Sequence, residues 1–96
     1  MKTNVNKDVE KDAEKVPKSI KALINENIKA LIEAENLSDV PNIIPMEGTK
    51  KPYFRLKIKS HRLLLYYEKE TKTVTVLALT HRKDTYKQEN LPWRRR

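Results

Sequence analysis

The chain has 96 residues, and its 21 Lys and Arg against 13 Asp and Glu give a formal net charge of +8. That length supports one hydrophobic core and is too short for two. The absence of Cys excludes disulfides and thiol chemistry, and because no apolar run approaches the roughly 18 residues of a membrane span or forms a secretion signal, we expect a cytoplasmic protein without a membrane segment.

The first half of the chain predicts a helical hairpin over residues 7–35, preceded by a possible edge strand at residues 1–6. Val9, Ala13 and Val16 follow the i, i+4, i+7 spacing, which predicts a helix over residues 7–15, and Asn6 is a suitable N-cap. Pro17 ends this helix. Residues 18–35 then show the spacing of a longer amphipathic helix, with apolar side chains at Ile20, Leu23, Ile24, Ile28, Leu31 and Ile32.

The second half predicts an antiparallel sheet over residues 53–82. Residues 36–51 contain Pro41, Pro45 and Gly48, which is typical of a connecting loop. After Pro52 the apolar period becomes two, which predicts strands at 53–59, 62–68 and 73–80, a turn at 69–72, and the second strand at the centre. Residues 88–96 form a basic tail. The fold class is therefore α+β: one domain over residues 1–96, with the helices on one face of a three- to four-stranded antiparallel sheet.

The excess positive charge lies in the second half of the chain. Residues 1–50 hold 8 basic and 9 acidic side chains, whereas residues 51–96 hold 13 basic and 4 acidic ones. Such asymmetry is typical of a protein with a polyanionic partner, of which nucleic acid is the commonest. A solvated basic face, or one that binds an acidic protein, is the alternative.

The predicted sheet places several cations on the face that the helices leave uncovered. Arg55, Lys57 and Lys59 alternate with apolar residues along one strand, and Arg62 begins the next strand across from them. Arg82 enters from the end of the third strand. Cations this close repel one another, and the phosphates of a nucleic acid would offset that repulsion. A solvated strand face remains the alternative.

Such a face suits RNA cleavage by attack of the neighbouring 2′-hydroxyl group. This reaction needs a base, an acid for the leaving oxygen and cations around the phosphorus, but no metal and no cofactor. The arginines can stabilise the developing charge, and crowding among cations makes Lys57 a candidate base. Tyr86 offers a ring on which a base can stack. Lys57 as a simple phosphate contact and Tyr86 as a rim aromatic are the alternatives.

Two histidines each precede one of these arginines. Because neighbouring strand residues point to opposite faces, His61 and Arg62 cannot both face a substrate from regular strand, and the same holds for His81 and Arg82. We prefer the arginines and keep the histidines as candidate acid or base groups. Two histidines lack the third ligand of a metal site, so no metal is expected.

Several stretches, taken in order, resemble the RelE/ParE superfamily of type II toxins, and in particular its RelE-like branch. They are Tyr53-Phe54-Arg55-Leu56-Lys57, His61-Arg62-Leu63-Leu64-Leu65-Tyr66, the Val and Thr strand at 72–76, and His81-Arg82-Lys83-Asp84-Thr85-Tyr86, with Val9-Glu10-Lys11-Asp12 and Val16-Pro17-Lys18 upstream. The resemblance covers residues 7–87. It implies a small α+β toxin that a cognate antitoxin holds inactive in a hetero-oligomer.

The resemblance also implies site residues. The family's basic strand positions fall on Arg55 and Lys57, its strand-start arginine on Arg62, its late arginine on Arg82 and its terminal tyrosine on Tyr86. Further contacts to RNA or the ribosome are expected from Lys51, Lys59, Lys83, Lys87 and Arg94. The chain departs from the pattern at His61, where an aromatic is common, and at Tyr53, where some active members carry Lys.

The function predicted from the sequence is that of a RelE-like mRNA interferase. RelE members cut mRNA in the ribosomal A site, so the expected partners are the ribosome, mRNA and the antitoxin. Two alternatives stay open. ParE members share the fold and instead poison DNA gyrase, and a catalytically weakened module would bind RNA without cutting it.

Overall fold

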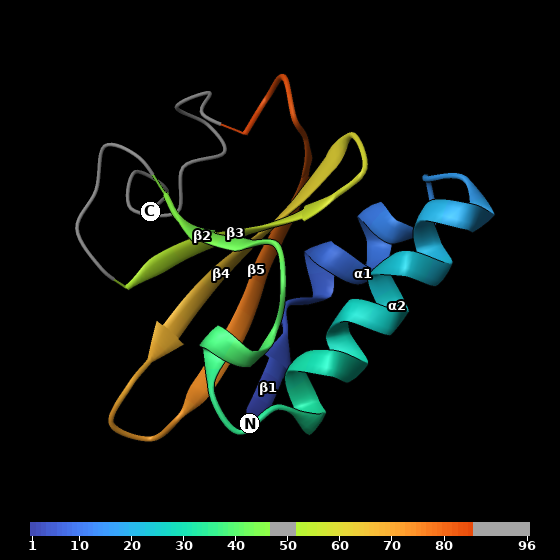
Figure 1. Cartoon of the computed structure of the whole chain (residues 1–96). Helices are drawn as coiled ribbons and strands as arrows, with labels where there is room; N and C mark the ends of the chain where they lie inside the picture. Colours follow the sequence, from blue (N-terminus) through green and yellow to red (C-terminus); the bar gives the residue numbers. More distant parts are fainter. Residues whose placement is uncertain (47–51, 86–96) are drawn as a thin grey trace.

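Two helices cover one face of a five-stranded sheet in the computed structural model, which describes residues 1–46 and 52–85 (Figure 1). The spatial order of the strands is β1-β5-β4-β3-β2. The helices are α1 (Lys7–Ala13) and α2 (Lys18–Glu33), and the strands are β1 (Lys2–Val5), β2 (Ile43–Pro45), β3 (Tyr53–Ile58), β4 (His61–Glu68) and β5 (Thr73–His81).

The helical hairpin forms as its sequence signals predict. The Oδ1 atom of Asn6 accepts a hydrogen bond from the backbone N–H of Asp8 at 3.2 Å, which caps α1. Pro17 lies at the N-cap of α2. Each helix ends two residues earlier than expected, α2 because Ala34 adopts an extended backbone. No helix among the described residues is long and apolar enough to cross a membrane.

The sheet is larger than the sequence predicts, because both of its edges carry a short extra strand. The possible strand at residues 1–6 is confirmed as β1, which pairs with β5 in parallel rather than antiparallel fashion. β2 lies inside the segment predicted as a loop and pairs with β3, with Ile43 opposite Leu56. Both strands are too short for an alternating pattern. They form by hydrogen bonding to the backbone groups that β5 and β3 present at the edges of the sheet.

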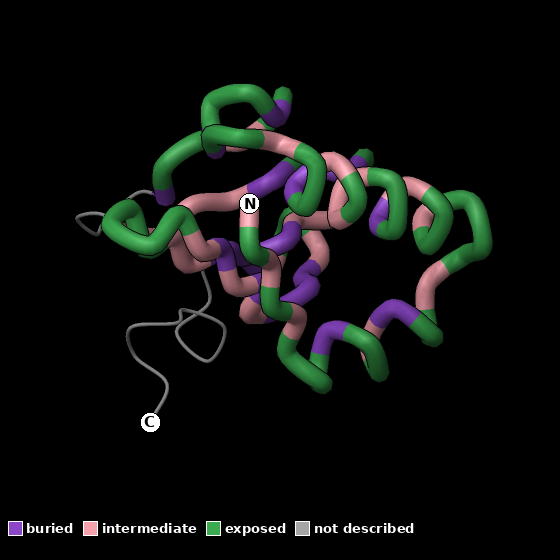
Figure 2. Tube along the Cα trace, turned by 90° about the horizontal axis from the view of Figure 1, so that it is seen from below, coloured by how far each residue is buried: buried purple, intermediate pink, exposed green. Residues whose placement is uncertain are grey.

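The core lies between the helices and the sheet, as the two apolar periods predict. Leu56 and Ile58 of β3 share one buried cluster with Ile24 and Leu31 of α2. Figure 2 shows buried stretches gathered in the middle of the molecule and exposed outer turns on the helices. Burying each such side chain contributes about 1.5–3 kcal/mol. Because alternate residues of a strand point to opposite faces, the residues between these apolar ones lie on the open face of the sheet.

Candidate active site

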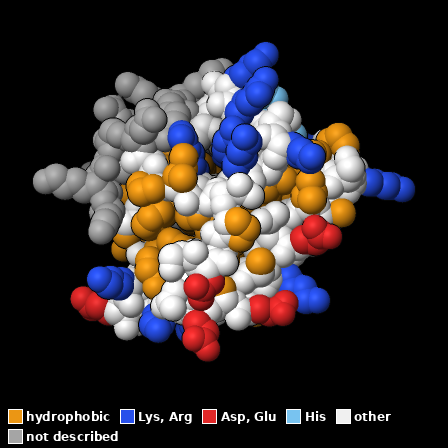
Figure 3. Space-filling model, viewed as in Figure 1, with side chains coloured by type: hydrophobic (Ala, Val, Ile, Leu, Met, Phe, Trp, Pro, Cys, Tyr) orange, Lys and Arg blue, Asp and Glu red, His pale blue; other side chains and the backbone are white. Residues whose placement is uncertain are grey.

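The candidate site lies on the open face of the sheet, beside the β3–β4 turn. Lys57 of β3 pairs directly with Arg62 of β4, and Arg55 pairs with Leu64. Directly opposed residues share a face, so both strands deliver cations to the same side. In Figure 3, Lys and Arg side chains gather along the upper edge, over the end of the sheet that holds this turn in Figure 1, and the acidic side chains of this view lie lower.

Three of these cations line one hollow. It has a volume of about 310 Å³, and its lining consists of Asn42, Ile44, Arg55, Lys57 and Arg62. None of these five residues is acidic. The volume lies at the lower end of the range for small-ligand sites. The hollow can therefore take an anionic group of modest size, such as the phosphate and sugar of a nucleotide.

Two backbone carbonyl groups hold the guanidinium of Arg62 in place. Its Nη1 atom donates hydrogen bonds to the carbonyl oxygens of Lys59 at 2.9 Å and His61 at 2.8 Å. Partial burial lowers the pKa of its guanidinium from the ordinary value, and the positive charges of Arg55 and Arg82 lower that pKa further. An arginine stays protonated at neutral pH in spite of such a shift. An anion bound here would therefore relieve the mutual repulsion of three guanidinium groups.

Arg82 reaches this cluster from a turn that follows β5. Its backbone N–H donates to the carbonyl oxygen of Ser60 at 2.7 Å, which continues the pairing between β4 and β5 by one residue. The hydroxyl groups of Thr80 and Thr85, both buried, lie 3.0 Å apart, and Thr85 Oγ1 donates to the carbonyl oxygen of His81 at 3.3 Å. These bonds close residues 80–85 into a latch that holds Arg82 beside Arg62.

Lys59 does not continue the cationic row, contrary to the sequence prediction. β3 ends at Ile58, and Lys59 lies in the two-residue β3–β4 turn with φ at 56°. The alternation of strand side chains stops where the chain reverses, so Lys59 leaves the open face. Lys83 is exposed in the turn at residues 82–85 and does not line the hollow.

The two histidines lie on the opposite face from the arginines. His61 and His81 are paired across β4 and β5, and their ring centroids are 5.5 Å apart in an edge-to-face arrangement. Burial lowers the pKa of His61, and the nearby charges of His81 and Arg62 lower it further. Because adjacent residues of a strand point to opposite faces, Arg62 faces the hollow and His61 faces away from it.

Four candidate residues lie outside the described part of the chain. They are Lys51, Tyr86, Lys87 and Arg94, and the basic tail at residues 88–96 lies there too. Their assignments stay sequence predictions. Conversely, Asn42 and Ile44 line the hollow although the sequence placed them in a connecting loop. The available signal was Asn42, because Asn tolerates the left-handed conformation that it adopts here, with φ at 67°.

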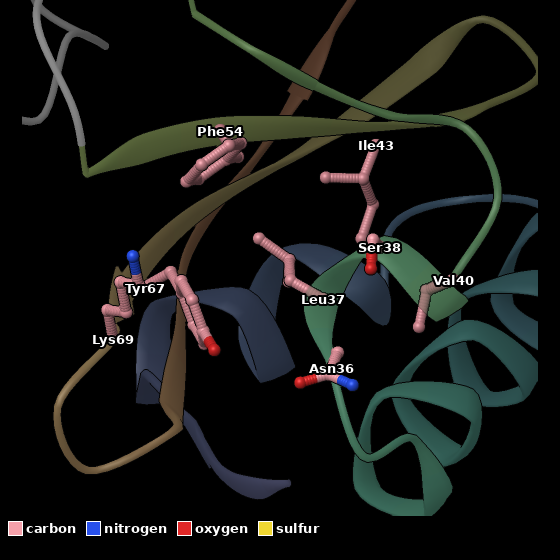
Figure 4. A pocket seen from close by; sticks show the side chains of 8 residues that line it. All are labelled: Asn36, Leu37, Ser38, Val40, Ile43, Phe54, Tyr67 and Lys69. Atoms are coloured by element: carbon pink, nitrogen blue, oxygen red, sulfur yellow. The ribbon is translucent and has the colours of Figure 1, made fainter.

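A larger hollow of about 540 Å³ lies on the helix-covered side of the sheet (Figure 4). The side chains of Phe54, Tyr67 and Leu37 face a shared space there, drawn from β3, β4 and the short helix η1 (Leu37–Asp39). Lys69 is the one cation in its lining, which is completed by Asn36, Ser38, Val40 and Ile43. This apolar groove lacks the convergent cations that a phosphate needs, which leaves the smaller hollow as the candidate site.

Comparisons with known proteins give one family and a consistent fold. A family model described as the ParE toxin of the type II toxin-antitoxin system, parDE, matches residues 3–86. No curated protein matches the chain. The fold of this chain is similar to that of toxins in three solved toxin–antitoxin complexes. Because the sequence identities are below 25%, these similarities show the fold alone.

The three structures cover nearly the whole of this fold. The RelB-RelE complex from Methanococcus jannaschii has 22% identity and a TM-score of 0.71, covering 88% of this chain and 95% of that one. The archaeal RelE-RelB complex from Pyrococcus horikoshii OT3 has 23% identity and a TM-score of 0.67, covering 84% and 93%. The RelBE2 complex from Mycobacterium tuberculosis has 21% identity and a TM-score of 0.66, covering 84% and 96%.

Proposed function

The chain belongs to the ParE toxin family of type II toxin-antitoxin systems, within the RelE/ParE superfamily, and on this premise we propose that it is an endoribonuclease that cuts mRNA on the ribosome. The observation that carries the proposal is the convergence of Arg55, Lys57 and Arg62 on one hollow. Arg82 lies close enough to lower the pKa of Arg62. A phosphodiester held there would meet cations on several sides.

In the proposed reaction, the 2′-hydroxyl group of one nucleotide attacks the adjacent phosphorus. Lys57 accepts the proton of that hydroxyl, a bond forms between the 2′-oxygen and phosphorus, and the bond from phosphorus to the 5′-oxygen breaks. Water at this open site supplies a proton to the leaving oxygen. Arg55, Arg62 and Arg82 stabilise the negative charge that develops on the phosphate oxygens. The products are a 2′,3′-cyclic phosphate and a 5′-hydroxyl end.

The partner of such a toxin is a cognate antitoxin. The three similar structures are described as complexes of a RelE-type toxin with its antitoxin. A chain with a net charge of +8 favours an antitoxin with an acidic segment that orders on the toxin and neutralises its cationic face. The toxin would act where ribosomes are, in the cytoplasm, once the antitoxin is removed.

Inhibition of DNA gyrase is the second candidate function. The observation in its favour is the family model, whose description names ParE. It predicts a loss of DNA supercoiling and a DNA-damage response while mRNA stays intact. The same cationic face could then serve as a binding surface without cleaving RNA.

The deciding experiment maps the 5′ ends of cellular mRNAs after induction of the toxin. For the wild type we expect new ends inside translated reading frames, and we expect Arg62→Ala and Arg82→Ala to abolish them. Lys21→Ala, which removes an exposed cation of α2 away from the hollow, is the matched control and should cut like the wild type. Growth arrest with intact mRNA would refute the endoribonuclease and support the gyrase inhibitor.

A further inference from the structure

A third hollow adjoins the candidate active site at the edge of the sheet. Its volume is about 410 Å³, and its lining comes from α2, from the residue before β2, and from the end of β3 with its turn: Leu23, Asn27, Asn42, Lys57, Ile58 and Lys59. Asn42 and Lys57 also line the cationic hollow. The two hollows therefore meet at these residues, at the start of β2 and the end of β3.

The lining of this hollow combines polar groups with two apolar side chains. Asn27 of α2 is half-buried, and its Nδ2 atom donates a hydrogen bond to the carbonyl oxygen of Leu23 at 2.7 Å. That bond orients the amide and leaves its Oδ1 atom as an acceptor. Asn42 supplies a second amide, while Leu23, which is half-buried, can contact the flat face of a ring. Nucleic-acid bases are recognised by this combination of amides and apolar contacts.

The backbone around the hollow adopts the left-handed conformation at two points. Among the described residues, three that are not Gly have positive φ, and two of them, Asn42 at 67° and Lys59 at 56°, line this hollow. The two-residue β3–β4 turn sets the conformation of Lys59, and Asn tolerates it at position 42. Here the backbone N–H of Lys57 donates to the carbonyl oxygen of Asn42 at 3.0 Å, which ties the amide-bearing loop to the cationic strand.

We propose that this hollow binds the base of a nucleotide adjoining the phosphate in the cationic hollow, so that cleavage depends on the identity of that base. Asn27 Oδ1 accepts a hydrogen bond from an exocyclic amino group, and Asn42 contacts a second polar atom of the base. Adenine, cytosine and guanine carry such an amino group, whereas uracil presents a carbonyl oxygen instead. Lys59 contacts the phosphate that follows. This inference rests on the proposed endoribonuclease activity.

The test compares the base composition beside the cut sites of four proteins after induction in cells. They are the wild type, Asn27→Leu, Asn42→Gly and the control Asn25→Leu, which makes the same change at an exposed position of α2 outside the hollow. Gly at position 42 keeps the left-handed backbone accessible while removing the amide. Thermal melts of the purified proteins show that each variant is folded.

We expect uracil to be depleted about fivefold or more at one position next to the wild-type cuts, the lower end of what one good base contact provides. Asn25→Leu should keep that depletion, while Asn27→Leu and Asn42→Gly should reduce it to less than about twofold. An unbiased wild type, or variants with an unchanged bias, would overturn the base site and leave the endoribonuclease standing. A wild type that makes no cuts would overturn both.

Discussion

The two faces of β3 and β4 have different roles: one packs against the helices, and the other carries the candidate site. On the covered face, Leu56 and Leu63 pair with each other and are fully buried. On the open face, in the adjacent pair toward the β3–β4 turn, Lys57 pairs with Arg62 beside the candidate site. Residues that are neighbours in the sequence thus serve stability and binding separately, because a strand turns alternate side chains to opposite sides. Substitutions in one of these two pairs should change one property and spare the other.

The largest effect is expected on the open face. Arg62→Ala should lower the rate of mRNA cleavage on translating ribosomes by about 10²–10³-fold, because removing one donor to a developing oxyanion has an effect of that size. The free energy of unfolding should change little, since the lost hydrogen bonds are offset by relief of repulsion from Arg55 and Arg82. Measured cleavage rates check the first expectation, and urea denaturation checks the second. A rate matching that of Lys21→Ala would contradict the assignment.

On the covered face, a substitution should lower the free energy of unfolding. Leu56→Ala should lower the free energy of unfolding by about 2–5 kcal/mol, because it leaves a cavity in the core. That is a large part of the roughly 5–15 kcal/mol by which domains are stable. Urea denaturation measures it, with Ile32→Ala as the control because Ile32 is 55% exposed. Equal losses in the two variants would show that Leu56 is not part of the core.

The latch at residues 80–85 tests whether the faces are fully separate, since its hydroxyl groups are buried yet hold a cation of the site. Thr85→Val should cost about 1–3 kcal/mol of stability, because it leaves the hydroxyl of Thr80 without its partner. Cleavage should fall as Arg82 loses its position. The double variant with Thr80→Val should be less destabilised than Thr85→Val alone, as denaturation of both would show. A double variant that is less stable than the single one would argue against the hydrogen bond.

The smallest effect concerns pH and the histidine pair on the covered side. The folded-state pKa of His61 lies below its ordinary value of about 6.5, first through burial and then through His81 and Arg62. Between those two values the unfolded chain binds more protons than the folded one, so stability decreases as pH falls through 6.5. The melting temperature should therefore drop slightly from pH 7.5 to pH 5.5.

A chemical-shift titration provides the direct check on this pair. His81→Gln removes one of the positive charges beside His61, so the pKa of His61 should move upward while burial keeps it below the ordinary value. A titration midpoint of His61 that does not move in this variant would show that the two rings do not interact.

The sequence predicts the features of this protein that depend on local periodicity. The apolar spacing of residues 7–35 indicates the helical hairpin, and Asn6 and Pro17 mark where its helices begin. The alternation in β3 separates Leu56 and Ile58 from Arg55 and Lys57. Given an antiparallel partner, it also places Arg62 across from Lys57. These features follow from the sequence because each depends on a repeat of two or of about 3.6 residues along one segment.

Only the tertiary structure decides what depends on segments that are far apart in the chain. β1 and β2 form by pairing with β5 and β3, which are distant in the chain, and their own residues carry no clear pattern. The row of cations ends before Lys59 because the chain reverses there. Asn27 and Asn42 come together because α2 packs across the end of β3. Such long-range contacts are determined by the packing of one element against another. No local repeat in the sequence encodes that packing.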